Sequence, residues 1–177
     1  GLDHQFEAPR VPPPEELEDA AFFGQKYPGA IAPRAQQLFE SVKPFEFRFV
    51  ETPGFTNTEK RPPLAHVWFR ALGKIESDDE GLHRCLLAYV SDYNLLGTAV
   101  LPHGIPLLAG KLMTASIDHG MWFHRAVRVD EWLLYATDSP SASGARGFTR
   151  GCIFTRDGRL VASTAQEGLI RLVAEKA

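Results

Sequence analysis

The chain has 177 residues, enough for one domain with a hydrophobic core, and its composition of 44% hydrophobic and 23% charged residues is typical of a soluble globular protein. A formal net charge of −3 argues against a nucleic-acid binder, whose surface would be basic. Two cysteines are too few for a disulfide scaffold and lack the paired spacing of a zinc site. Because no apolar run approaches the roughly 20 residues that span a bilayer, we expect no membrane partner and a cytoplasmic protein.

The first 44 residues differ in composition from the rest. Proline recurs throughout them, and acidic residues cluster between Glu15 and Asp19. Proline removes backbone donors and favours extended neighbours, so residues 1–44 are predicted to form a linker or wrapping arm, with a short helix around residues 15–22. Residues 45–177 are the predicted folded domain. A domain that opens on such a segment is expected to continue from another domain upstream.

Two strands and one helix are predicted next. Residues 45–50 and 66–72 alternate apolar and polar side chains, the period of a half-buried strand. Residues 82–96 are predicted to form a helix that ends at Gly97, a residue favoured just past helix ends. From Cys85 onwards this helix is apolar on almost every side, which indicates burial within the fold.

After Pro102 and Pro106, strand patterns continue to the end of the chain. The expected strands cover residues 114–125, 131–137, 146–155 and 160–173, with a tight turn at Asp157-Gly158. One buried helix followed by consecutive antiparallel strands predicts an α+β fold in which the sheet wraps the helix, the hotdog arrangement.

Asp92 is the first candidate for chemistry, because it falls late in a helix that is predicted to be buried. A buried carboxylate is costly unless it is paired, hydrogen-bonded or neutralised. It could satisfy nearby backbone donors or lie near enough to the helix end to be solvated, or it could be kept to activate water, since such acids cluster at active sites. The residues alone leave both readings open.

Gln166 and Ser116 are weaker candidates. Gln166 interrupts the small and apolar run of residues 160–165, where a hydrogen bond across the sheet would explain it equally well. Ser116 is a hydroxyl in a predicted strand, which by itself indicates nothing. Residues 139–147 are rich in small residues, including Ser141, Ser143 and Gly144, and Arg146 and Arg150, which lie within and just after them, are suited to phosphate. Such a stretch either approaches a ligand, with Arg146 beside it, or forms a β-bulge against a neighbouring domain.

Several blocks of the sequence stand in the order found in a known family. They are Tyr89-Val90-Ser91-Asp92, Leu101-Pro102-His103-Gly104, residues 116–125, residues 131–135, Ala145-Arg146-Gly147-Phe148 and Ala165-Gln166-Glu167-Gly168. The chain resembles the C-terminal half of type II acyl-CoA thioesterases, the bacterial thioesterase II and peroxisomal group, over residues 1–173. In that family the Pro-rich opening links two hotdog domains.

The resemblance implies an oligomeric double-hotdog enzyme that hydrolyses acyl-CoA thioesters to fatty acid and CoA. It implies that Asp92, Ser116 and Gln166 together position and activate a water molecule, with no metal or cofactor. Ser141, Ser143, Gly144 and Arg146 are the expected substrate-binding residues. The expected partner is a second hotdog domain or a second copy of the chain.

A second hypothesis is a hotdog half that binds acyl-CoA or serves only as structure, and that needs an N-terminal partner domain. The joint presence of Asp92, Ser116 and Gln166 counts against it. A hotdog hydratase would show a Gly-Asp-x-Asn-Pro-like block, which the sequence lacks.

Overall fold

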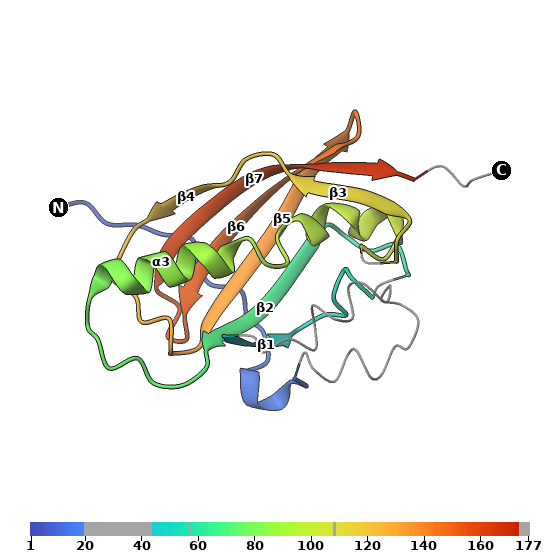
Figure 1. The fold of residues 1–177 in the computed structure, drawn as a ribbon. Helices are drawn as coiled ribbons and strands as arrows, with labels where there is room; N and C mark the ends of the chain where they lie inside the picture. The colour runs from blue at the N-terminus through green and yellow to red at the C-terminus, as the bar shows by residue number, and fades with distance from the viewer. Residues whose placement is uncertain (20–43, 57, 108, 174–177) are drawn as a thin grey trace.

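The structure is a computed structural model, and it describes residues 1–19, 44–56, 58–107 and 109–173. Seven strands form one antiparallel sheet in the order β1-β2-β5-β6-β7-β3, with β4 also paired to β7 (Figure 1). The strands are β1 Phe45–Phe49, β2 Leu64–Ala71, β3 Leu112–Ser116, β4 Gly120–Phe123, β5 Leu133–Ser143, β6 Arg146–Thr155 and β7 Leu160–Leu172.

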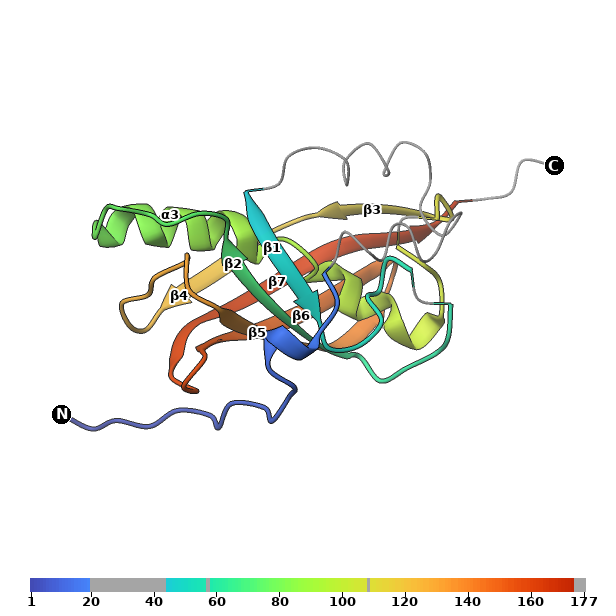
Figure 2. The same cartoon turned by 90° about the horizontal axis from the view of Figure 1, so that it is seen from below.

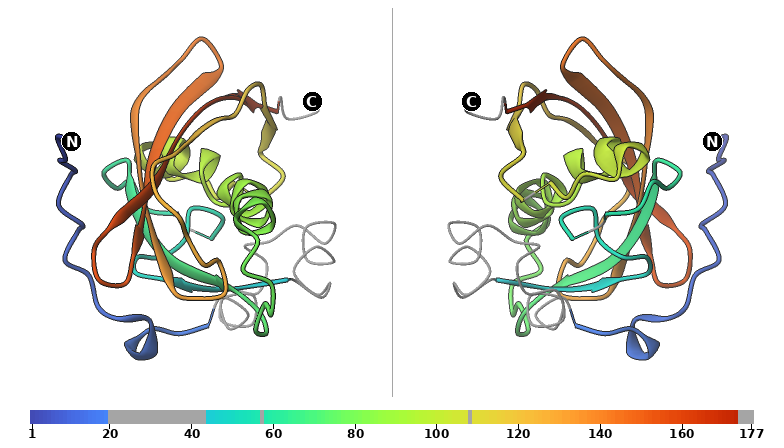
Figure 3. Two further views of the ribbon diagram at one scale, coloured as in Figure 1. Left: turned by 90° about the vertical axis from the view of Figure 1, so that its left-hand side faces the viewer. Right: turned by 90° about the vertical axis from the view of Figure 1, so that its right-hand side faces the viewer.

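Within the described residues, the sheet curls around a single α-helix, α3, of residues Glu80–Ser91. Views along the helix show the curved sheet enclosing it on one side (Figure 3). A 3-10 helix, η2, of residues Leu96–His103 continues along the same concave face and contacts β5, β6 and β7. One helix against the inner face of a curled antiparallel sheet is the arrangement that the order of elements predicted.

Helix α3 ends at Ser91, and the predicted extension to Leu96 is wrong. Asn94 takes the left-handed backbone conformation with φ 67°, which an α-helix cannot accommodate. Asp92 caps the helix end, and the chain then turns into η2. The predicted stop signal, Gly97, lies inside η2 instead.

The expected burial of the helix on every side is also wrong. Leu87 and Val90 face the sheet and are buried, whereas Cys85 and Tyr89 are exposed. A sheet that curls around one side of a helix covers only one face, so the apolar pattern on the other face requires a different explanation.

The N-terminal residues 1–19 lie against the outer face of the sheet (Figure 2). A 3-10 helix, η1, covers Pro14–Glu16, and Leu17 is extended, so the helix expected over residues 15–22 is wrong for residues 17–19; residues 20–22 lie outside the described residues. The indole Nε1 of Trp68 donates to the Pro12 carbonyl at 2.9 Å, and the Arg156 guanidinium pairs with the Glu15 carboxylate. This part of the predicted arm therefore wraps the sheet.

Tyr135 of β5 joins the sheet to the end of the helix. Its buried hydroxyl donates to the Ser91 carbonyl at 3.0 Å and accepts from Thr164 Oγ1 of β7 at 2.7 Å. Burial raises the pKa of Tyr135, so the hydroxyl stays protonated as a donor. Gly151 of β6 lets the ring lie flat on the sheet, because a Cβ there would stand 2.2 Å from Tyr135 Cε2.

Tyr135→Phe is expected to lower the free energy of unfolding by about 1–3 kcal/mol, because it leaves the buried Thr164 hydroxyl and the Ser91 carbonyl without a partner. Urea unfolding measures the change. The matched control is Tyr89→Phe, which removes an exposed hydroxyl bonded to Tyr93 and should cost less than about 0.5 kcal/mol. Equal losses in the two variants would contradict this role for Tyr135.

Candidate active site

Asp92 lies at the end of α3, and its side chain is 54% exposed. The expectation of a buried carboxylate is therefore wrong, for the same reason that the predicted helix end is wrong. The helix ends at Ser91, the residue before Asp92, so Asp92 stands past the last turn, at the rim of the concave face. Its exposure permits contact with a water molecule and a ligand.

The structure brings the three predicted catalytic residues together. Asp92 Oδ1 accepts hydrogen bonds from Gln166 Nε2 at 2.7 Å and from Ser116 Oγ at 3.2 Å. Ser116 pairs with Gly168 across the β3–β7 ladder, so Gln166 lies two residues away on the same inward face of β7. The two strands thus deliver a hydroxyl and an amide to a carboxylate supplied by the helix end.

Gln166 is fully buried, and its amide is only half satisfied. The Asp92 carboxylate can only accept, so Nε2 must face it, and Oε1 is left buried without a hydrogen-bond partner among the described residues. A buried acceptor in this state costs about 1–3 kcal/mol. An amide at this position therefore lowers the stability of the fold, so stability does not explain why Gln166 occupies it.

A break in the edge of the sheet positions Ser116 and His119. The strand expected over residues 114–125 is two strands, because the backbone N–H groups of Ile117 and Asp118 both donate to the Glu167 carbonyl. The Asp118 carboxylate accepts the Glu167 N–H at 2.7 Å and so replaces a ladder bond. Three residues, 117–119, here face two residues of β7, and this one extra residue turns the chain towards Asp92.

His119 is a neighbour of Asp92 that sequence reasoning missed. Its Nδ1 lies 3.8 Å from Asp92 Oδ1, and its Nε2 lies 2.8 Å from Ser91 Oγ. Because Ser91 Oγ donates to the Ala88 carbonyl, Nε2 is the donor in that bond. The sequence pointed to His119 only indirectly, because this histidine lies three positions after Ser116 in the block of residues 116–125.

All of these contacts fall on one carboxylate oxygen. Asp92 Oδ2 has no hydrogen-bond partner in the part of the chain that the structure describes, and the side chain is half exposed. A carboxylate that is fixed through one oxygen and open at the other has the geometry of a general base.

Of the four expected substrate-binding residues, Ser143 and Arg146 line a cavity of about 200 Å³ between η2 and the strands. Ser141 and Gly144 do not line it. Ser141 pairs with Phe148 just past a register shift, so the expected β-bulge is present, and Gly144 forms the turn that leads into β6. The Arg146 guanidinium bonds to the Glu167 carboxylate at 3.0 Å, and Arg150 bonds to Asp138, so both charges already have partners.

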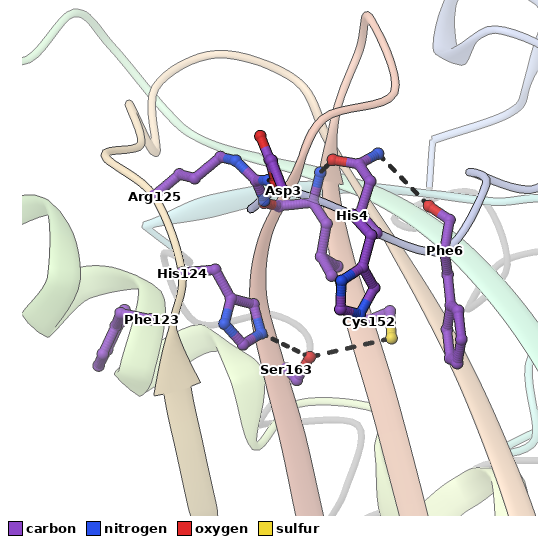
Figure 4. Close-up of a pocket in the computed structure, with 10 residues that line it drawn as sticks. Asp3, His4, Phe6, Phe123, His124, Arg125, Cys152 and Ser163 are labelled. Carbon is purple, nitrogen blue, oxygen red and sulfur yellow. Dashed lines mark hydrogen bonds and ion pairs between the residues drawn. The ribbon is translucent and has the colours of Figure 1, made fainter. Parts of the chain in front are cut away.

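A second hollow lies under the N-terminal arm (Figure 4). His124 Nε2 lies 2.9 Å from Ser163 Oγ, with Cys152 Sγ 4.0 Å from that oxygen. Burial raises the pKa of the Cys152 thiol and keeps it protonated. Ser163 faces the opposite side of β7 from Gln166, so this hollow is separate from the Asp92 group.

Comparison with solved structures identifies the fold. A protein of unknown function with a hotdog fold from Alicyclobacillus acidocaldarius matches 98% of this chain and 58% of its own length, with a TM-score of 0.64 at 17% identity. Acyl-CoA thioesterase II TesB2 from Mycobacterium marinum matches 98% of this chain and 59% of its own, with a TM-score of 0.72 at 39% identity. The molecule is a hotdog domain with an acid–hydroxyl–amide group at its helix end.

Sequence comparison gives the family. The family model described as acyl-CoA thioesterase matches residues 35–169, and acyl-coenzyme A thioesterase 8 of Mus musculus is 40% identical over 97% of this chain and 55% of its own length. The chain belongs to the acyl-CoA thioesterase family. It spans about half the length of the curated relatives it matches.

Two further findings concern the described residues only. They contain no cluster of three or more His, Cys, Asp or Glu side chains that could hold a metal ion. None of the helices described is long and apolar enough to cross a membrane.

Gln166→Met should raise the free energy of unfolding by roughly 1 kcal/mol, because it removes a buried acceptor without a partner and keeps the side-chain volume. Asp92, which loses one donor, is exposed enough to bond water instead. Urea unfolding compares this variant with Thr149→Val, which removes a buried hydroxyl bonded to the Gln166 carbonyl and should lose about 1 kcal/mol. A loss of stability in Gln166→Met similar to that in the control would refute the cost assigned to the amide.

Proposed function

We propose that this chain supplies the active site of an enzyme that hydrolyses acyl-CoA thioesters to free fatty acid and CoA. The observation that carries the proposal is the convergence of Ser116 Oγ and Gln166 Nε2 on one oxygen of Asp92. Membership of the acyl-CoA thioesterase family supplies the substrate class.

In the proposed reaction a water molecule binds at the open Oδ2 of Asp92. The carboxylate accepts a proton from it while the water oxygen attacks the thioester carbonyl carbon. The tetrahedral intermediate then collapses with cleavage of the C–S bond, and the proton held by Asp92 passes to the departing CoA sulfur. Ser116 and Gln166 act by fixing the carboxylate, so the base is already oriented when the substrate arrives.

The alternative is a half that binds acyl-CoA, or serves as structure, without hydrolysis. The buried Gln166 amide donates to the Asp92 carboxylate, and its oxygen bonds none of the described residues, a geometry that favours the catalytic proposal over a purely structural domain.

A partner for the uncovered side of the molecule is part of the proposal. Tyr89 and Leu82 on α3, and Ile117 and Trp122 at the free edge of the sheet, are large apolar residues that are 40% to 56% exposed. Such residues mark interaction surfaces when they gather on one side. A second hotdog domain, or a second copy of this chain, would cover them, and the matched relatives are nearly twice as long as this chain. Cytoplasmic location and the absence of a nucleic-acid partner stay predictions.

Asp92→Asn should lower kcat for acyl-CoA hydrolysis by about 100-fold or more, because an amide cannot accept the proton of water. The assay follows release of free CoA thiol, using the chain alone and with the proposed N-terminal domain supplied. Asp157→Asn, in the distant β6–β7 turn, is the control and should keep full activity. Full activity of Asp92→Asn at saturating substrate would refute the proposed function.

Ser116→Thr should retain kcat within about threefold, because threonine keeps the hydroxyl that bonds Asp92. Ser116→Ala removes that bond and should cost about tenfold, the equivalent of roughly 1.4 kcal/mol. The same thiol assay on the two variants, with circular dichroism as a check of folding, tests the role. A folded Ser116→Thr variant as slow as Ser116→Ala would show that the hydroxyl is not what matters at this position.

A further inference from the structure

His119 lies at the break between β3 and β4, next to the end of α3, and 22% of its side chain is exposed. Its Nε2 lies 2.8 Å from Oγ of Ser91, a residue with no exposed surface. Its Nδ1 lies 3.8 Å from Oδ1 of Asp92. The two ring nitrogens therefore face consecutive residues of the chain, one buried and one at the candidate site.

Ser91 determines which ring nitrogen of His119 carries the hydrogen. The Ser91 hydroxyl has one hydrogen and donates it to the Ala88 carbonyl at 2.8 Å, because a carbonyl can only accept. The ring must then donate to Ser91 Oγ, so the hydrogen is on Nε2. A neutral imidazole has a single N–H group, so Nδ1 presents a lone pair to Asp92. The neutral ring thus leaves the charge of the carboxylate uncompensated.

A second proton on the ring changes the surroundings of Asp92. Both nitrogens of a protonated imidazole are donors, so a positive charge would face Oδ1 across the 3.8 Å that separate it from Nδ1. Opposite charges at such a distance attract each other strongly even where solvent is near. A carboxylate that is stabilised by a cation is a weaker base and accepts a proton from water less readily. The neutral ring is therefore the form that permits Asp92 to act.

The acids on the sheet side of His119 are already engaged. The Asp118 carboxylate accepts the Glu167 N–H at 2.7 Å, and the Glu167 carboxylate accepts from Arg146 at 3.0 Å. Among the described residues, Asp92 is the one acid with an oxygen within 4.0 Å of a ring nitrogen. The charge of the ring therefore acts mainly on Asp92.

The groups on the helix side keep their charge state. The Tyr93 hydroxyl stays protonated, because its hydrogen bond with Tyr89 raises the pKa of Tyr93 to about 12. Arg84 of α3 pairs with Glu80 at 2.6 Å. Histidine is the side chain that ordinarily changes charge between about pH 5 and 8. The ring of His119 is therefore the group whose protonation can alter the candidate base in this range.

We propose that His119 is a positioning residue that acts through Asp92. The neutral ring, held by Ser91, leaves the carboxylate free to accept a proton from water, and the protonated ring withdraws the carboxylate from the reaction. The inference rests on the proposed thioesterase function and adds a control of that function by pH. Hydrolysis should fall as the pH decreases and the ring becomes protonated.

The test compares the wild type with His119→Gln in the assembly that shows hydrolysis. Glutamine has no ionisable group, and its amide nitrogen reaches about as far as the ring Nε2, so a donor to Ser91 is kept. The kcat for decanoyl-CoA is measured from about pH 5 to pH 8 through loss of the ultraviolet absorbance of the thioester. The ratio of kcat at about pH 5.5 to kcat at about pH 8 should be at least about tenfold higher in the variant, because a charge at this distance is worth about that factor in the barrier.

His124→Gln is the matched control. It removes another histidine of the same block, one that bonds Ser163 on the opposite face of β7 from Gln166, and it should keep the wild-type dependence on pH. An unchanged pH dependence in a folded His119→Gln variant, with circular dichroism as the check of folding, overturns the proposal and leaves the thioesterase function intact.

His119→Asn gives a second variant should His119→Gln fail to fold. Asparagine also lacks an ionisable group, but its amide is too short to reach Ser91, so kcat should fall by about tenfold at every pH while the decline at acid pH is lost. A uniform fall in kcat with the wild-type pH dependence retained would assign the residue a structural role only and overturn the proposal. Absence of hydrolysis in the wild type, with both hotdog domains present, overturns the proposed function as well.

Discussion

The position of the last turn of α3 determines the rest of the site. The buried Tyr135 hydroxyl donates to the Ser91 carbonyl, and Ser91 Oγ in turn accepts from His119, so the helix end is tied to β5 and to the edge of the sheet. Asp92 is the next residue, and its place relative to β3 and β7 follows from those bonds. A shift of one residue in the helix end would rotate the carboxylate by about 100° and separate it from Ser116 and Gln166.

The order and type of the elements could be predicted from the sequence because each strand carries its own alternation. The two-strand edge could not, because its break depends on the Asp118 carboxylate replacing a ladder bond to Glu167. The helix end was missed for a related reason. No local sequence pattern indicated the left-handed conformation of Asn94. The apolar run beyond Asn94 continues into η2, so the pattern gave no sign that the α-helix had ended.

The candidate site, too, could be predicted from the sequence only in part. Asp92 was selected because it was expected to be buried, and the structure shows it exposed. Gln166, the weaker candidate on residues alone, is fully buried. The resemblance to type II thioesterases named the three residues together. The hydrogen bonds that make them a group span 24 and 74 positions of sequence, and they form because β3 pairs with β7 and the end of α3 packs against both strands. Of the four residues expected to contact substrate, Ser143 and Arg146 line the cavity of about 200 Å³, and Ser141 and Gly144 do not.

The break at residues 117–119 also governs how another chain can add to this edge. In a regular strand alternate N–H groups point outward, ready to pair with a newcomer. Here two consecutive N–H groups, those of Ile117 and Asp118, both donate to the Glu167 carbonyl on the neighbouring strand β7, so neither is available to a docking strand. A strand docking along β3 and β4 can therefore pair on either side of the break but not across it. A strand docked there would leave residues 117–119, directly beside Asp92, without backbone pairing to it.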